Sequence, residues 1–568
     1  MASTIFLSGT YGSAPNNMTS LRWFAVPAAI WMALAMLFAI AKPGVGLPQY
    51  IFLTQDVPVA AAMIGFLMLV RLSGQTTRTQ LLIQPRILTA AMLAMAGIAW
   101  IGHYWLMQGY EFSRDEDLAR LAASYIARGD LGIAIPPEWR AFHGAMLPEF
   151  QHPIGGDRYW ISIYLPGSAL IEALVSQVAD PALSQPLLLL IGLAALWQVS
   201  KVLLPDRPDS RIIVMLLALT SSQLLFNAMT PYAMTAHFAL NLLWLALFVA
   251  DRPLAHAGAI LVGALALGLH KVQFHALFAG PVLIILLYQR RWLLSAIYAI
   301  SYSIFIIFWL KLYPLMLAHI LDLPPSAAGS KNLSISPRLY SLDPLIYIPR
   351  FFAWNNVLLL PLALLGAWGA AKDVRKNKIA TYPNLLFLAL AAGCATGMLL
   401  TVHQGFGWGY RYLHGYIGPF CLLAGRGWSS RPVALSSIRP VLQSCLLALI
   451  LMIVQAAIIY RFATPHARAH ADIVARKTDV VLVDARGSVF GQDVVRIDGR
   501  MSHKPVIMSM AHLDPATVPN LCRRYKVEVF DRAGFARVGV KGADMEPSST
   551  TKRMDMIQNY LARTGCVS

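Results

Sequence analysis

Charged side chains are scarce in this chain. Asp, Glu, Lys and Arg make up 13% of its 568 residues, and hydrophobic residues make up 57%. A soluble globular domain carries about 25% charged residues. The mean hydropathy is +0.57. This composition excludes an ordinary soluble protein, and we see no internal repeat, low-complexity tract or long linker.

Cysteine is equally rare, with five residues in the chain. Cys394, Cys421 and Cys445 fall in or near long apolar segments, where buried thiols act as inert packing residues. Cys522 and Cys566 fall in a polar tail that we predict to lie outside the cytoplasm. An oxidising compartment would allow a Cys522–Cys566 disulfide there.

Long apolar runs are what the chain has in abundance. Runs of roughly 16–24 residues are each long enough to cross a hydrocarbon core of about 30 Å as a helix. They lack the alternation of barrel strands, and only helices or closed barrels satisfy their backbone in lipid. The sequence therefore predicts a polytopic all-α membrane protein with about 13 transmembrane helices. The predicted spans are 22–41, 54–72, 87–107, 184–203, 211–228, 234–250, 255–270, 273–289, 292–315, 349–370, 382–401, 411–427 and 440–460.

Basic residues gather in alternate loops between these spans. They share one face if 161–177, which Pro166-Gly167 interrupts, is a juxtamembrane helix rather than a span. The positive-inside rule makes that face cytoplasmic, so topology explains the net charge of +18 and we predict no nucleic-acid partner. The outward-facing segments are then 108–160, 228–233, 316–348, 402–410 and the tail after 461.

The composition becomes more polar after residue 461. We predict a membrane domain over 1–461 and a soluble extracytoplasmic α/β domain over 462–568. The tail has β-like runs and a helix-like segment near its end, which is typical of a small α/β fold. The runs are 480–483, 494–497, 505–508 and 527–530, and the helix-like segment is 551–563.

Three adjacent carboxylates, Asp115-Glu116-Asp117, stand at the start of the first large outer loop. One interpretation is a capping box, in which Ser113 and Glu116 satisfy free amides of a helix over 114–128. The other is a general base at a membrane-facing cavity, which accepts the proton of an attacking hydroxyl. The sequence leaves both open.

The loop and several later phrases resemble glycosyltransferases of the GT-C superfamily, such as protein O-mannosyltransferases and aminoarabinose transferases. These enzymes use polyprenyl-phosphate sugars and carry an acid pair in the first large outer loop, before a helix and a Pro-Gly stretch. Three apparent spans precede the acid loop here, where many relatives have one. The matching phrases are Asp115-Glu116-Asp117-Leu118-Ala119, Arg128-Gly129-Asp130, Tyr164-Leu165-Pro166-Gly167, Gly268-Leu269-His270-Lys271 and Gly409-Tyr410-Arg411-Tyr412.

The resemblance implies a GT-C-like fold with juxtamembrane helices in the outer loop. It also implies an inverting transfer of one sugar from a polyprenyl-phosphate donor to a lipid, polysaccharide or protein acceptor. Asp115 would be the general base, Glu116 a supporting carboxylate and Asp117 an alternative. No covalent intermediate would be needed.

Basic residues at the outer ends of two spans could hold the donor phosphate. Lys271 with His270 forms one such pair, and the alternative is a lysine that snorkels to the interface. Arg411 with Tyr412 forms the other, since a guanidinium suits two phosphate oxygens. The alternative for Arg411 is an anchor within an aromatic belt.

Other polar residues of the outer face could line the same cavity. They are His152, Asp157, Arg158, Tyr232 and His403. His143, Glu149 and His152 could also converge on a divalent metal, although their spacing fits no metal signature. We assign no cofactor from the sequence.

Two other function classes compete with the glycosyltransferase. A secondary transporter or lipid flippase would place ionisable residues near the bilayer midplane, where the predicted spans hold almost no acids. A membrane scaffold or assembly protein would use the tail as its binding module, and its carboxylates would be dispensable. Compact loops favour a bacterial inner membrane, with the site and the tail facing the periplasm.

Overall fold

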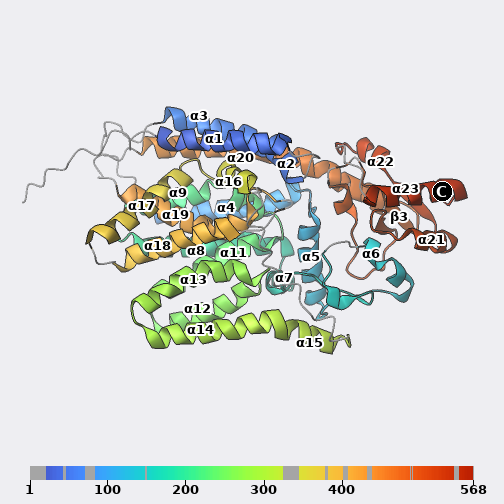
Figure 1. Ribbon diagram of the computed structural model, residues 1–568, viewed down its shortest axis with the longest axis horizontal. Helices are drawn as coiled ribbons and strands as arrows, with labels where there is room; N and C mark the ends of the chain where they lie inside the picture. Colours follow the sequence, from blue (N-terminus) through green and yellow to red (C-terminus); the bar gives the residue numbers. More distant parts are fainter. Residues whose placement is uncertain are drawn as a thin grey trace, which may run out of the picture.

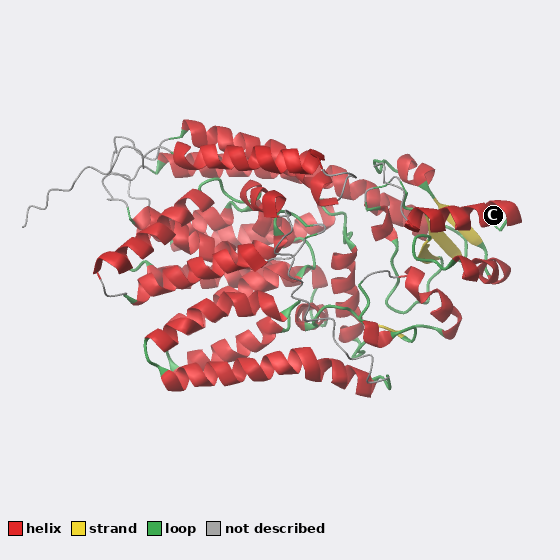
Figure 2. Ribbon diagram, in the orientation of Figure 1, coloured by secondary structure: helices red, strands yellow, loops and turns green. Residues whose placement is uncertain are grey.

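A computed structural model gives the structure of the chain. It describes residues 21–41, 47–70, 84–146, 150–323, 344–377, 381–400, 404, 407–430, 438–486, 488, 490–542 and 549–566. Helices make up most of this part, and the strands lie mainly near the C-terminus (Figure 2).

A bundle of long helices forms the larger part of the molecule (Figure 1). The C-terminal strands and short helices lie at one end of this bundle, and α5 lies between the two parts, across the helix ends (Figure 1). The bundle helices are α1 (Arg22–Ala41), α2 (Leu47–Ile51), the π-helical turn η2 (Phe52–Asp56), α3 (Val57–Leu69), α4 (Pro85–Trp105), α8 (Ser184–Leu203), α9 (Pro208–Leu219), α10 (Ser222–Asn227), α11 (Ala233–Val249), α12 (Pro253–Leu267), α13 (Val272–Tyr288), α14 (Trp292–Ile307), the π-helical turn η6 (Phe308–Leu312), α15 (Tyr313–Ile320), α16 (Pro344–Ala353), α17 (Leu359–Asn377), α18 (Tyr382–Leu400), the 3-10 turn η9 (Arg411–Tyr416), α19 (Ile417–Ser429) and α20 (Arg439–Val474).

Six helices among the described residues are long and apolar enough to cross a membrane. These six helices make the chain a helical membrane protein. The remaining apolar helices are shorter, and the total of about 13 spans stays a prediction. The six are Arg22–Ala41, Gln49–Leu69, Pro85–Trp105, Pro181–Leu203, Trp292–Ile320 and Arg439–Val474.

Polar side chains interrupt two of the predicted spans. The span predicted over 349–370 is divided between α16 and α17, where Asn356 Oδ1 accepts a hydrogen bond from Leu358 N (3.0 Å) in the turn before α17. The span predicted over 211–228 is divided at Thr220 and Ser221, and Ser221 caps α10 by accepting from Leu224 N (3.2 Å). Side chains that bond local backbone groups favour such breaks.

The outer loop is folded rather than open. It contains α5 (Arg114–Ala127), β1 (Ile133–Ala134), the 3-10 turn η3 (Pro137–Phe142), α6 (His143–Met146), the 3-10 turn η4 (Pro153–Gly155), β2 (Tyr159–Trp160) and α7 (Gly167–Ser176). Strands β1 and β2 pair antiparallel. Helix α7 has 10 residues, about 15 Å, which is half the hydrocarbon thickness, so it cannot cross a bilayer alone.

The C-terminal segment carries a parallel three-stranded sheet in the order β4-β3-β5. Residues 494–497, predicted as a strand, form none in the structure: Val494 ends a 3-10 turn, and Asp493 and Arg496 are engaged with α5 instead. The elements are β3 (Val480–Val483), η11 (Gly491–Val494), β4 (Val506–Ser509), η12 (Pro515–Thr517), α21 (Val518–Arg524), β5 (Val527–Phe530), α22 (Arg532–Arg537) and α23 (Ser549–Thr564). Cys522 and Cys566 form a disulfide.

The C-terminal segment and the outer loop share one hydrophobic core. Leu118 and Leu121 of α5 belong to the same buried cluster as Val480 and Leu482 of β3. Helix α20 runs through residue 461 without a break. The division at 461/462 into two domains stays a prediction, and the observed packing joins the tail to the loop that carries the acidic cluster.

Candidate functional site

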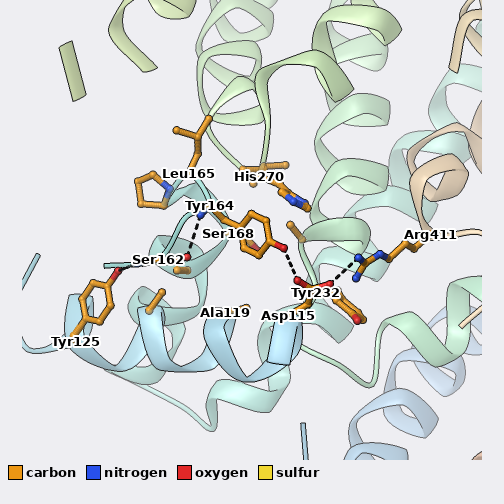
Figure 3. Close-up of a pocket in the computed structure, with 15 residues that line it drawn as sticks. Asp115, Ala119, Tyr125, Ser162, Tyr164, Leu165, Ser168, Tyr232, His270 and Arg411 are labelled. Carbon is orange, nitrogen blue, oxygen red and sulfur yellow. Dashed lines mark hydrogen bonds and ion pairs between the residues drawn. The ribbon is translucent and has the colours of Figure 1, made fainter. Parts of the chain in front are cut away.

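Four segments that are far apart in the sequence meet at one cavity. Asp115 comes from the first turn of α5, Tyr164 precedes α7, His270 lies between α12 and α13, and Arg411 begins η9 (Figure 3). The cavity, with its open mouth, has a volume of about 480 Å³. Its other lining residues are Ala119, Ala122, Tyr125, Ser162, Leu165, Pro166, Ser168, Ala169, Tyr232, Ala233 and Leu269.

Asp115 is held from two sides. Its Oδ2 lies 2.7 Å from Arg411 Nη2, and its Oδ1 accepts a hydrogen bond from the Tyr164 hydroxyl (Figure 3). The Asp115 side chain is 11% exposed and that of Arg411 is 4% exposed, so the pair is shielded from solvent. Burial, together with the Asp115 charge, raises the pKa of Tyr164 well above its usual value, so this phenol stays a donor. Asp115 is therefore oriented by Tyr164 and Arg411 at the wall of the cavity.

Aromatic rings and a buried amide orient Arg411. Its guanidinium carbon lies 4.8 Å from the ring centre of Tyr232 and 5.3 Å from that of Tyr412. Its backbone N–H donates to Gln404 Oε1 (2.9 Å). The approach to Arg411 runs through Gly409, whose φ of +71° favours glycine and whose carbonyl accepts from Gln404 Nε2 (3.0 Å). These contacts fix the position of the Arg411 guanidinium.

Backbone contacts join two of the matching phrases. Leu165 N donates to His270 O (3.2 Å), and Gly167 N donates to Gly268 O (2.7 Å). A Cβ at position 167 would stand 2.7 Å from Gly268 O, so this approach requires glycine. The ring of Tyr164 then meets that of His270 edge-on at 4.2 Å between centroids.

The three adjacent carboxylates have three different surroundings. Glu116 completes the capping box: its Oε2 accepts from Ser113 N (2.8 Å), and Ser113 Oγ accepts from Glu116 N (3.4 Å). Glu116 is fully buried, and burial raises its pKa to about 8. Asp117 turns toward Arg496 (3.7 Å), and burial raises its pKa to about 6. Because each helix position rotates by about 100°, the three side chains point in different directions. The capping box is confirmed for Ser113 and Glu116, while the general base stays a prediction.

Lys271 and His270 stand at the edge of this arrangement. His270 lines the cavity, and its Nε2 has no hydrogen-bond partner among the described residues. Lys271 is half-buried; burial lowers its pKa, while the charge of Asp115 acts to raise it. Lys271 does not line the cavity, but it is close enough to interact electrostatically with Asp115 and Arg411.

Several predicted cavity residues lie elsewhere. His152, Asp157 and Arg158 do not line this cavity: His152 Nδ1 accepts from Ile154 N (3.2 Å), and Arg158 is exposed and donates to Asp322 O (3.2 Å). Asp157 is exposed on the turn before β2. His403 and Glu149 lie outside the described residues. Within the described ranges, no group of three or more His, Cys, Asp or Glu could hold a metal ion, and the metal site with Glu149 stays untested.

A second buried ion pair contacts the backbone at Gly407, four residues before Arg411. Arg350 Nε lies 2.7 Å from Asp56 Oδ2, and both side chains are fully buried. Arg350 Nη2 donates to Gly407 O (2.7 Å), and the Trp354 indole donates to Asp56 Oδ1. The predicted site did not include this pair, although a lone acid and a lone arginine in otherwise apolar stretches are a signal for it.

No protein-family model matches the chain, and no curated protein matches it in sequence. In structure, the chain is similar to ArnT from Cupriavidus metallidurans in the apo state, with a TM-score of 0.49 and 11% identity over 74% of this chain and 85% of that one. It is also similar to ArnT from Cupriavidus metallidurans bound to undecaprenyl phosphate, with a TM-score of 0.44 and 13% identity over 69% and 66% of the two chains. At these values the assignment of chemistry depends on the chain's own residues.

Proposed function

We propose that this protein is an inverting membrane glycosyltransferase that moves one sugar from a polyprenyl-phosphate donor to a hydroxyl acceptor on the extracytoplasmic face. Asp115 is the general base. Arg411, Lys271 and His270 receive the donor phosphate, with Tyr412 supporting Arg411. The acceptor is a lipid, polysaccharide or protein.

The chemical step follows from the groups at the cavity. The acceptor oxygen attacks the anomeric carbon and gives its proton to Asp115, while the bond from that carbon to the phosphate oxygen breaks. The polyprenyl phosphate leaves with the bonding electrons, and nearby cations stabilise its growing negative charge. One displacement inverts the configuration, so one base is enough.

The observation that carries this proposal is the Asp115–Arg411 pair at a cavity where four matching phrases meet. Among the described lining residues, Asp115 supplies the one carboxylate and Arg411 the one guanidinium. A phosphate can compete with Asp115 for the Arg411 fork, because arginine binds both anions in the same geometry. Donor binding would then release Asp115 Oδ2 to accept a proton.

The test is sugar transfer in isolated membranes with a panel of radiolabelled polyprenyl-phosphate sugars. Wild type should transfer from at least one donor, and Asp115→Asn should lose about 100-fold or more of that activity at matched expression. Undecaprenyl phosphate, the lipid in the second ArnT structure, serves as a competitor whose binding should weaken in Arg411→Lys.

Glu138→Gln is the control, because Glu138 is exposed and outside the cavity lining. Equal transfer by wild type and Asp115→Asn would refute the base assignment. If the wild-type chain instead moves lipid across vesicles with no transfer to any acceptor, the flippase class is favoured over the enzyme.

A further inference from the structure

Helix α5 is held on its other side by the C-terminal segment. Arg114 donates twice to Asp493 Oδ1, from its backbone N–H and from Nε, each at 3.0 Å. The two side chains are 10% and 12% exposed. Asp493 lies in η11, between β3 and β4, so a loop of the parallel sheet reaches the first turn of the helix that carries Asp115.

Arg496 contacts both the first turn of α5 and the residues just before that helix. Its guanidinium carbon lies 3.8 Å from the ring centre of Tyr110, and its Nη1 lies 3.6 Å from Glu111 Oε2 and 3.7 Å from Asp117 Oδ1. Its Nε donates to Asp493 O (3.2 Å). Arg496 is 7% exposed, so these charge contacts are shielded from solvent.

The far end of α5 has a contact with the same loop. Arg128, the residue after α5, donates from Nη2 to Gly499 O (2.8 Å). Residues 490–499, which we name the clasp, therefore hold α5 at both ends. Asp493, Arg496 and Gly499 are not among the residues that line the cavity.

We infer that the clasp positions Asp115 for proton transfer, so that the C-terminal segment takes part in catalysis without touching the substrate. This inference rests on the proposed function. Arg114 and Asp117 face the clasp, and Asp115 between them faces the cavity. A rotation of α5 about its axis would break the clasp contacts and move Asp115 away from Tyr164 and Arg411 together. Asp493 and Arg496 are positioning residues in this account.

A merely structural clasp would give a different kinetic result from a positioning clasp. Loss of positioning lowers kcat for the chemical step and leaves donor binding intact, because Arg411 and Lys271 do not belong to α5. We expect the Asp493→Asn/Arg496→Gln variant to lose about 10- to 100-fold in kcat, while KM for the donor rises by less than about 2-fold. The single variant Arg496→Lys should keep a higher kcat than Arg496→Gln, because a lysine keeps a positive charge between Glu111 and Asp117.

The matched control changes the same residue types in the same segment. Asp472→Asn/Arg537→Gln removes a partly exposed pair whose atoms lie 3.7 Å apart, and it should leave kcat unchanged. Hydrogen exchange of the full-length protein gives a readout that needs no donor. Amides of α5 should lose about 10-fold or more of their protection in the clasp variant, while those of α8 keep theirs.

A disulfide between α5 and the clasp would replace the lost contacts if the Asp493→Asn/Arg496→Gln variant is unstable. A Cβ at Gly499 would stand 3.0 Å from Ser124 Oγ, which suits a disulfide in Ser124→Cys/Gly499→Cys. This pair, added to the clasp variant and oxidised, should restore both kcat and α5 protection, whereas either cysteine alone should restore neither.

The outcomes separate the clasp from the proposed function. Lower kcat with loss of α5 protection and rescue by the disulfide supports the clasp. Unchanged protection of α5, or unchanged kcat in an active protein, overturns it. If wild type transfers no sugar, the proposed function fails, and the catalytic role of the clasp fails with it. Hydrogen exchange then tests only whether residues 490–499 hold α5: unchanged protection of α5 would overturn that contact as well.

Discussion

Glu116→Gln should stabilise this protein at neutral pH, although it removes a member of a capping box. Glu116 is fully buried, and burial raises its pKa from 4.5 in a free chain to about 8. The folded state therefore binds a proton that the unfolded state has released at pH 7. Stability that is present below pH 4.5 is lost as the pH rises toward 8.

The size of this effect follows from the two pKa values. Each pH unit between them removes about 1.4 kcal/mol, so Glu116 costs about 3 kcal/mol of the free energy of unfolding at pH 7. A glutamine has nearly the shape of the protonated acid, and its oxygen can still accept from Ser113 N. The variant should match wild type near pH 4 and exceed it by about 3 kcal/mol at pH 7.

Unfolding in detergent micelles, followed across pH 4 to 8, measures this difference. The exposed residue Glu138 provides the control, and Glu138→Gln should change stability by less than about 0.5 kcal/mol. Sugar transfer by Glu116→Gln should remain, in contrast to Asp115→Asn. A variant that is less stable than wild type at pH 7, or a difference that is constant with pH, would refute the assignment of a buried, neutral Glu116.

Two further substitutions test the supports of the cavity. Asp56→Asn leaves the buried Arg350 without its counter-ion and should cost about 3–5 kcal/mol in detergent unfolding, whereas Asp373→Asn, at a partly exposed pair, should cost less than about 1 kcal/mol. Gly167→Ala forces a Cβ to 2.7 Å from Gly268 O and should lower sugar transfer by about 10-fold or more, whereas Gly144→Ala, which meets no atom within 4 Å, should not.

Local patterns predicted the elements well. The capping signature of Ser113 and Glu116 predicted a helix over 114–128, and α5 covers Arg114–Ala127. Runs rich in valine predicted strands at 480–483 and 527–530, which are β3 and β5. These features depend on residues a few positions apart, which is the range over which periodicity and capping operate.

The roles of the three carboxylates could not be read from the sequence, because they depend on how α5 is rotated. Its rotation is set by contacts such as Arg114 with Asp493, 379 positions later. The same contacts explain the wrong strand at 494–497: valines favour extended chain, but the buried pairing of Asp493 and Arg496 with α5 outweighs that preference. The Asp56–Arg350 pair, 294 positions apart, was hidden for the same reason.

The two charged residues of the cavity stand on segments with little stability of their own. Helix α5 has 14 residues, a length at which an isolated helix is marginal, and Arg411 follows the positive φ of Gly409. Each segment is held by a buried ion pair from a distant part of the chain: Arg114–Asp493 for α5, and Asp56–Arg350, through Gly407 O, for the approach to Arg411. Buried ion pairs contribute little net stability compared with apolar packing, and in some proteins they serve to specify one geometry. We therefore expect an apolar replacement of either pair to keep the fold and to lower sugar transfer, measured in the membrane assay at matched expression.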